Sequence, residues 1–289
     1  MFKSQFIQYI SSEKRFSEHT VKSYTTDISQ FQDYLSSEFD ITNKVDEISF
    51  QIIRSWIAFL LERGITPRSV NRKISTLKTY FKFLLRAGML SENPMLKVIA
   101  PKSKKRLPFF IEEDQIETLL NEVEFEDGFI GERNKLIIEL FYVTGIRLSE
   151  LINIKITAID FENNLVKVLG KRNKERLIPL TVNMLEELKN FIKKHHLNHF
   201  LFTNLDGNKL YTKLVYRVVS KYIGKISSVN KKSPHILRHT FATHMLNNGA
   251  DINAIKELLG HANLSATEVY THNTIEKLKS VYKQAHPRA

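Results

Sequence analysis

The residues from Ser233 to His239 combine a predicted helix start with side chains that bind anions. Ser233 and Pro234 are favourable at the N-cap and first helical positions, so they predict that a helix begins here. In that helix His235 lies in the first turn, and Arg238 lies three residues later on the same face. The free backbone amides and the positive end of the dipole at a helix start attract phosphate. The segment therefore predicts a phosphate-binding site.

A metal site is the alternative interpretation of this segment. His235 and His239 are four residues apart, which is the spacing of two zinc ligands on one helix face. However, Ile236 stands where a metalloprotease needs its glutamate, and no further ligand cluster is evident nearby in the sequence. The sequence therefore favours phosphate binding, and we expect no metal and no cofactor.

Three other segments carry side chains that could take part in chemistry, although each has an ordinary structural explanation. Gly145 can end a helix and let Arg147 project from the junction. Lys171 lies in a predicted turn, where most lysines are simply exposed. His261 follows a predicted helix cap, and Tyr270 lies nine residues beyond it. Spacing alone does not distinguish Tyr270 among the ten tyrosines of the chain.

The charge of the chain favours a polyanionic partner. Its 289 residues include 43 Lys and Arg against 31 Asp and Glu, which gives a formal net charge of +12. Because a fixed positive field attracts polyanions, nucleic acid is the favoured partner, although many basic proteins bind none. The chain has no cysteine, which excludes disulfides, cysteine-based zinc sites and thiol catalysis.

The sequence also indicates where the protein resides. No stretch approaches the roughly 20 apolar residues that a membrane-spanning helix needs. The first residues form an amphipathic pattern and not the apolar core of a signal peptide. We therefore expect a cytoplasmic protein with no membrane partner.

Four helical patterns occupy the first hundred residues and predict a first domain over residues 1–92. The fourth pattern opens at Thr66-Pro67 and carries an apolar stripe on one face. Its other faces are basic, and residues 63–106 hold twelve basic residues against one acid, Glu92. We expect this face to contact DNA phosphates. The candidate DNA-binding residues of this helix are Arg68, Arg72, Lys73, Lys78 and Lys82.

Residues 93–108 contain three prolines and five basic residues and show no helical periodicity, so we expect a basic linker there. Helical patterns return in residues 109–289, the expected second domain. Within it, residues 163–168 and 175–180 are short runs rich in β-branched residues, and they predict a β-hairpin. The turn between them is basic and adds Arg172 and Lys174 as candidate DNA-binding residues.

The ordered motifs of the second half resemble those of the tyrosine recombinases of the phage integrase family. They are Thr144-Gly145-x-Arg147-x-Ser149-Glu150-Leu151, Gly170-Lys171, His235-x-x-Arg238-His239, and Leu259-Gly260-His261 with Tyr270. The sequence is most similar to the XerC/XerD type, because the length, the N-terminal helices and the run from Phe241 to Asp251 also match. The resemblance covers essentially the whole chain. It departs from the usual pattern only beside the motifs, at Arg172 and Ala266.

The resemblance implies a fold and a role for each motif residue. The fold would be mainly α, with an N-terminal four-helix SAM-like DNA-binding bundle and a mostly helical catalytic domain that contains a small antiparallel β-sheet. Tyr270 would attack the phosphorus and form a 3′-phosphotyrosyl intermediate without metal or ATP. The catalytic set would be Arg147 and Arg238 as phosphate clamps, His235 assisting Tyr270, Lys171 protonating the leaving oxygen, and His261 donating a hydrogen bond. Glu150 would orient catalytic basic groups, or it would be an ordinary surface acid.

The resemblance also implies partners. They are double-stranded DNA with a dif-like site, a tetramer on paired sites, a second Xer recombinase and an FtsK-type translocase, in chromosome dimer resolution. A C-terminal helix with Ile275, Leu278 and Tyr282 as its apolar stripe would dock into a neighbouring subunit, or it would pack on its own domain.

Three other functions remain open at the level of the sequence. The chain could be the integrase of a mobile element, although many of these carry an additional N-terminal arm-binding domain. It could be a type IB topoisomerase, which shares the same residue types but relaxes DNA as a monomer. It could also be a DNA-binding protein that does not catalyse any reaction.

Overall fold

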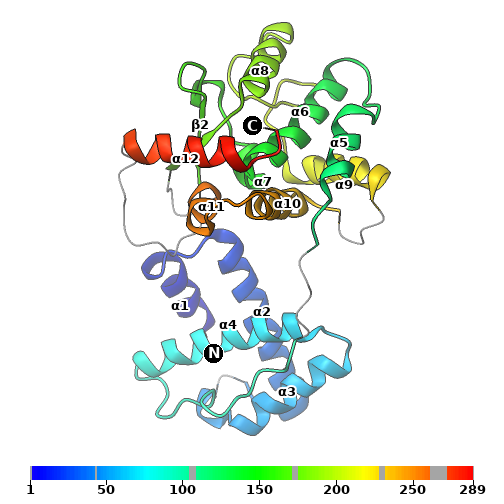
Figure 1. Ribbon diagram of the computed structural model, residues 1–289. Helices are drawn as coiled ribbons and strands as arrows, with labels where there is room; N and C mark the ends of the chain where they lie inside the picture. Colours follow the sequence, from blue (N-terminus) through cyan, green and yellow to red (C-terminus); the bar gives the residue numbers. More distant parts are fainter. Residues whose placement is uncertain are drawn as a thin grey trace. The chain divides into compact units, whose positions relative to one another are not determined.

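The structure is a computed structural model that describes residues 2–42, 44–103, 109–170, 175–227, 232–260 and 272–288, with residues 272–274 described by their backbone alone. The chain divides into two compact units, residues 1–106 and 107–289, shown in Figure 1. Among the described residues, no helix is long and apolar enough to cross a membrane.

The described part of the N-terminal unit is a helical bundle. Side chains at three helix starts accept a hydrogen bond from a backbone amide, and these residues are Ser17, Ser49 and Thr66. The bundle core is aromatic, with the rings of Phe31 and Trp56 4.9 Å apart. Its elements are α1 (Lys3–Gln8), the π-helix η1 (Tyr9–Glu13), α2 (Glu18–Phe39), the 3₁₀ helix η2 (Val45–Glu47), α3 (Phe50–Glu62) and α4 (Pro67–Arg86).

Helix α4 has the amphipathic character that the sequence predicts. Its apolar stripe is buried in the bundle core and consists of Val70, Ile74, Leu77, Phe81 and Leu84. The segment after α4 is partly attached to the same core, because Met95 and Val98 are buried within it. Residues 93–98, which we expected to belong to the linker, therefore pack on the N-terminal unit.

The C-terminal unit is mostly helical, with one small sheet in its described part. Strands β1, β2 and β3 pair antiparallel in that order, with Leu165 opposite Pro179 at one end of the β2–β3 pair. The predicted β-hairpin is confirmed, while its turn, residues 171–174, lies outside the described residues. The two-residue strand β1 is too short to show an alternating pattern. The strands are β1 (Ile159–Asp160), β2 (Leu165–Leu169) and β3 (Glu175–Pro179).

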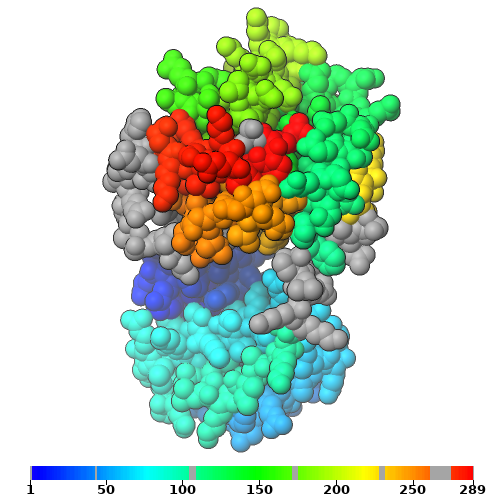
Figure 2. Space-filling view, viewed as in Figure 1, coloured from blue at the N-terminus to red at the C-terminus, as the bar shows by residue number. Residues whose placement is uncertain are grey.

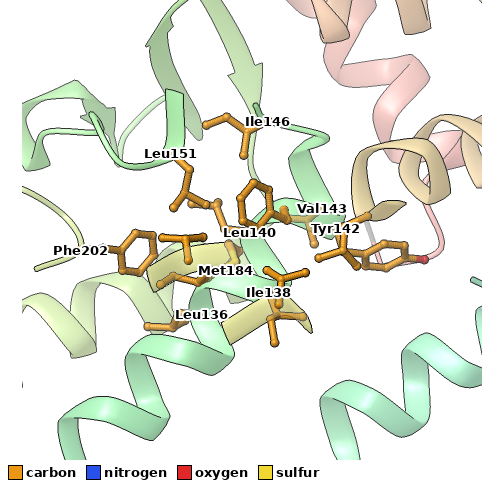
Figure 3. Packing of buried hydrophobic residues seen from close by; sticks show 14 of the residues in the cluster. Leu136, Ile138, Leu140, Tyr142, Val143, Ile146, Leu151, Met184 and Phe202 are labelled. Atoms are coloured by element: carbon orange, nitrogen blue, oxygen red, sulfur yellow. The ribbon is translucent and has the colours of Figure 1, made fainter. Parts of the chain in front are cut away.

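Helix α6 (Gly128–Thr144) runs through the core of the C-terminal unit. Every residue from Leu136 to Ile146 is buried, and Figure 3 shows Leu136 and Leu140 beside Met184 and Phe202. The other helical elements are α5 (Glu113–Asn121), α7 (Leu148–Leu151), the 3₁₀ helix η3 (Ile156–Ala158), α8 (Val182–Lys194), α9 (Thr212–Ile226), α10 (Pro234–Asn247), α11 (Ile252–Leu259) and α12 (His272–Ala285).

Gly145 ends α6 in the left-handed conformation, with φ +57°, at a point of very close packing. A Cβ atom at this position would lie 2.5 Å from Cδ1 of Phe241 and 2.7 Å from Cδ2 of Leu259. Phe241 belongs to α10 and Leu259 ends α11. The missing side chain therefore lets the end of α6 touch both helices.

The C-terminal helix α12 packs on its own domain in this structure. Leu278 and Tyr282 are buried in a cluster with Phe241 and Met245 of α10. In Figure 2 the red atoms of α12 lie directly against the orange atoms of α10 and α11. At these two positions the predicted apolar stripe is therefore buried within the single chain.

His286 follows α12 and is buried in its neutral form. Its Nε2 atom lies 3.3 Å from the carbonyl oxygen of Tyr142, and its Nδ1 atom accepts a hydrogen bond from the backbone amide of Arg288. Protonating Nδ1 would break the second bond. Burial is the main reason why the pKa of His286 is lowered to about 4.

We predict that Gly145→Ala destabilises the protein by about 2–4 kcal/mol, because it adds overpacking to the cost of a left-handed alanine. Gly249→Ala is the matched control, since Gly249 has φ +84° but a Cβ atom added there would meet no described atom within 4 Å. The control should lose only about 1 kcal/mol. Urea denaturation measures both values, and equal losses would show that the close packing carries no cost.

We also predict that acid weakens the packing of the C-terminal segment. Because the folded pKa of His286, about 4, lies below its unfolded value, this stability is complete above about pH 6.5 and is lost as the pH falls toward 4. His286→Gln should have a shallower decline in thermal stability than the wild type between these pH values. Parallel declines in the two proteins would contradict this role of His286.

Candidate active site

The last turn of α11 binds three arginines through three successive backbone carbonyls. Leu258 O accepts from Nε of Arg176 at 2.8 Å, and Leu259 O accepts from Nη2 of Arg238 at 2.6 Å. Gly260 O then accepts from Nη2 of Arg147 at 2.9 Å. Carbonyls at a helix end lack intrahelical partners and carry the negative end of the helix dipole. The end of α11 therefore gathers three positive side chains from three different elements.

Those elements bring the arginines from distant parts of the chain. Arg176 lies in β3, Arg147 is the N-cap of α7, and Arg238 lies in α10. Arg238 also donates from Nη1 to Gly145 O at 2.6 Å, so the end of α6 holds it as well. The close packing at Gly145 thus contributes directly to the position of this guanidinium.

Glu150 is the acidic partner of two of these arginines. Its Oε1 accepts from Nη1 of Arg176 and of Arg147, at 2.6 and 2.9 Å. Its Oε2 accepts from Nη2 of Arg176 and from the backbone amide of Arg147, both at 2.8 Å. Burial alone would raise the pKa of Glu150, but the bonds from Arg176 and Arg147 outweigh burial and lower the pKa. The predicted pairing of Glu150 with a basic group is confirmed.

The cluster carries more positive than negative charge. It contains three guanidinium groups and, among its described residues, the single carboxylate of Glu150. Burial, and then repulsion from Arg147 and Arg176, lowers the pKa of Arg238 to about 9. A bound anion would relieve this repulsion, so the electrostatics of the cluster favour a phosphate.

Arg147 and His235 are the site residues whose side chains solvent reaches. The side chain of Arg147 is 30% exposed, whereas Arg238 is buried. His235 is exposed in the first turn of α10, the helix that carries Arg238. Partial burial, and then the charges of Arg238 and His239, lower the pKa of His235 below its ordinary value. His235 is therefore neutral near pH 7 and can accept a proton.

The start of α10 differs in one detail from the sequence prediction. Ser233 occupies the N-cap position and Pro234 the first helical position, as predicted. However, the side chain of Ser233 makes no capping hydrogen bond. Arg238 points into the buried cluster while His235 is exposed, so the two side chains differ in accessibility.

Several predicted site residues lie outside the described part of the chain. The structure brings together Arg147 and Arg238, with His235 on the same helix as Arg238. The remaining predicted residues of this domain lie outside the described ranges, and they are Lys171, Arg172, Lys174, His261 and Tyr270. In the described ranges, no group of three or more His, Cys, Asp or Glu side chains could hold a metal ion.

Arg176 is the site residue that our sequence reasoning missed. Strand β3 buries Arg176 and Ile178, which are two residues apart, while Glu175 is exposed. A charged residue at an inward position of a short amphipathic strand requires a buried partner. The alternation of inward and outward positions in this strand could have indicated that Arg176 is buried, but it did not identify Glu150 as its partner.

The basic residues of α4 in the N-terminal unit have two different environments. Arg68, Lys78 and Lys82 are exposed, as expected for residues that contact phosphates. Lys73 is a correction to the prediction, because its ammonium is buried 2.9 Å from Oδ1 of the fully buried Asp27.

Arg72 shares this carboxylate. Its Nη2 donates to Oδ1 of Asp27 at 2.8 Å, although almost half of the Arg72 side chain remains exposed. The buried carboxylate of Asp27 therefore requires positive partners, and it forms ion pairs with both Lys73 and Arg72 of α4.

The sequence matches known families over both units. Residues 110–277 match the family described as phage integrase family, and residues 4–88 match the phage integrase, N-terminal SAM-like domain. The chain is 41% identical to the tyrosine recombinase XerC of Staphylococcus epidermidis, over 98% of this chain and 96% of that protein. It is 39% identical to the same recombinase of Staphylococcus aureus, with the same coverage.

Solved structures share the fold. The XerH site-specific recombinase bound to difH substrate, in a pre-cleavage complex, has a TM-score of 0.71 and 23% identity, over 97% of this chain and 84% of that chain. The Tn1549 transposon integrase in complex with circular intermediate DNA also has a TM-score of 0.71, at 19% identity, over 95% and 98% of the two chains. With these matches, the chain belongs to the phage integrase family, as a DNA strand-transferring tyrosine recombinase of the XerC type.

Proposed function

We propose that this protein is a site-specific recombinase that cuts and rejoins double-stranded DNA through a 3′-phosphotyrosyl intermediate on Tyr270. One observation carries the proposal: Arg147 and Arg238 are fixed side by side on successive carbonyls of α11, with only one carboxylate among the described residues of their cluster. Two oriented guanidinium groups with uncompensated charge suit a phosphodiester, whose oxygens gain negative charge in the transition state.

The reaction balances without an external energy source. The phenolic oxygen of Tyr270 attacks the phosphorus, the bond from phosphorus to the 5′-oxygen breaks, and the 3′-phosphate becomes linked to the tyrosine. A 5′-hydroxyl of the exchanged strand then attacks the same phosphorus and releases Tyr270. Because each step replaces one phosphate ester with another, the bond energy is retained.

Proton transfer accompanies each step. A phenol has an ordinary pKa near 10, so a base must accept its proton during the attack. We assign this task to His235, because burial and the charge of Arg238 lower its pKa and so favour the neutral form that can accept a proton. We assign protonation of the leaving 5′-oxygen to Lys171 and a hydrogen bond to the phosphate to His261, on the resemblance of their motifs. Glu150 orients Arg147 through two hydrogen bonds and does not contact the phosphate.

The biological substrate that we propose follows from the XerC-type relatives. It is a dif-like site on the chromosome, and the result is resolution of chromosome dimers during segregation in the cytoplasm. The reaction would need a tetramer on paired sites, a second Xer recombinase and an FtsK-type translocase. In that assembly α12 would leave its packing on α10 and dock into a neighbouring subunit.

The expected first domain, residues 1–92, would hold the DNA through the exposed basic face of α4. This role is supported by the matched SAM-like domain and by the exposure of Arg68, Lys78 and Lys82. Residues 93–108 would connect the DNA-clamping domain to the catalytic domain, residues 109–289. Arg172 and Lys174 would add phosphate contacts from the hairpin turn.

We predict that wild-type protein forms a covalent adduct with a nicked duplex carrying a dif-like site, because loss of the short nicked fragment prevents religation. Tyr270→Phe should form no adduct, since it lacks the attacking oxygen. Tyr216→Phe on α9, whose side chain is half exposed, is the matched control and should retain the adduct. Denaturing gels in the presence of a metal chelator measure the product. An adduct with Tyr270→Phe, or none with the wild type, would contradict the proposal.

We further predict that Lys78→Ala and Lys82→Ala each reduce the salt dependence of DNA binding. Loss of one phosphate contact should change the slope of log K against log salt concentration by about 1. Lys73→Met should leave that slope unchanged and instead lower the thermal stability, because it removes a buried partner of Asp27. Fluorescence anisotropy at several salt concentrations measures the slope. If only Lys73→Met changed it, Lys73 would be the phosphate contact, and Lys78 and Lys82 would not.

A further inference from the structure

We propose that Arg176 is a positioning residue for DNA cleavage, acting on Arg147 through Glu150 and on the end of α11 through Leu258. The inference rests on the function proposed above and deepens it. Arg176 itself does not contact the phosphate. It holds the groups that do.

Arg176 uses all of its guanidinium nitrogens in hydrogen bonds while it is buried. Its side chain is 4% exposed, yet Nε, Nη1 and Nη2 each donate to an acceptor. The two Nη atoms meet the two oxygens of Glu150 in the paired arrangement that a planar guanidinium favours. This geometry fixes the rotation of the Glu150 carboxylate as well as its distance.

The carboxylate that Arg176 fixes in turn orients Arg147. With Arg176 in place, each oxygen of Glu150 accepts one bond from Arg176 and one from Arg147. The backbone amide and one Nη atom of Arg147 are therefore both held by Glu150. Without Arg176 the carboxylate keeps only its two bonds to Arg147, so it is held less firmly and orients Arg147 less precisely.

Arg176 lies between several segments of the chain. It lies two residues after the end of the hairpin turn 171–174, and it contacts α7 through Glu150 and α11 through Leu258. Gly260 lies against it, because a Cβ atom there would be 3.0 Å from Cδ of Arg176. A single buried side chain thus ties together three segments that bear predicted catalytic residues or lead to them.

The stability of the fold alone does not explain a buried arginine at position 176. Replacing a buried ion pair with apolar residues is often neutral or stabilising, since burying two charges is costly. The positive charge of Arg176 also contributes to the repulsion that Arg238 experiences. This repulsion favours an anion near Arg238, without any contact between that anion and Arg176.

The test compares Arg176→Lys and Arg176→Met with the same changes at Arg133. Arg133 is also buried, but its partners are Thr203 and Asn134 near the opposite end of α6. The three measurements are the thermal midpoint, the affinity for duplex DNA, and the single-turnover rate of adduct formation on the nicked duplex at saturating protein. The rate reports on geometry in the bound complex, which a general loss of stability would not change.

We expect the Arg176 variants to form the adduct about 10- to 100-fold more slowly than the wild type, as for a small displacement of catalytic groups. DNA affinity should change less than about threefold, and Arg133 variants with a similar loss of thermal midpoint should keep the wild-type rate. In a Glu150→Gln background, Arg176→Met should have a smaller effect on the rate than in the wild-type background, because part of its action passes through Glu150.

The outcomes separate the inference from the proposed function. Three outcomes would overturn the role of Arg176 and leave the proposed function intact. The Arg176 variants could form the adduct at the wild-type rate, or the Arg133 variants could lose as much of the rate as the Arg176 variants do. The effects of Glu150→Gln and Arg176→Met on the rate could also be independent of each other. A wild type that forms no adduct overturns the proposed function and this inference with it. If Arg176→Met fails to fold, Arg176→Lys, which keeps the charge, decides the question.

Discussion

The arrangement of the C-terminal unit depends on the binding of three arginines by the last carbonyls of α11. A helix end must find donors for its free carbonyls, and here the donors are Arg176, Arg238 and Arg147, in the order of residues 258, 259 and 260. Each arginine belongs to a different element, so the same contact orients strand β3, helix α10 and the start of α7. Gly145 makes it possible, because its lack of a side chain lets α6 approach both α10 and α11.

This contact leaves positive charge that the described residues of the cluster do not neutralise. Backbone carbonyls orient guanidinium groups but remove no net charge, and Glu150 balances only one of the three. Burial is the largest cause of the lowered pKa of Arg238 and of His235, and this excess charge lowers both further. Burial and this charge together favour a bound anion and a neutral His235, and both features would assist the proposed attack of Tyr270 on a phosphodiester.

Local signals in the sequence predicted much of the fold, and contacts between distant residues explain what they missed. Caps such as Thr66 and the apolar stripe of α4 indicated helices directly, and the β-branched runs indicated the β2–β3 hairpin. The predicted helix start at Ser233 already indicated His235 and Arg238 as a phosphate site, and the motif resemblance added Arg147 and the catalytic roles. Lys73 was misplaced because its burial depends on Asp27, 46 residues earlier. Arg176 was missed because its partner, Glu150, lies 26 residues away in α7.

The central claim is that Arg147 and Arg238, held by α11, bind the phosphate that Tyr270 attacks. The most direct measurement is a crystal structure of the Tyr270→Phe protein with its DNA site, in which cleavage cannot proceed. We predict one phosphate that accepts hydrogen bonds from both guanidinium groups, while Leu259 O and Gly260 O still hold the arginines and Glu150 still joins Arg147 to Arg176. A complex in which the two arginines contact different phosphates, or none, would contradict the claim.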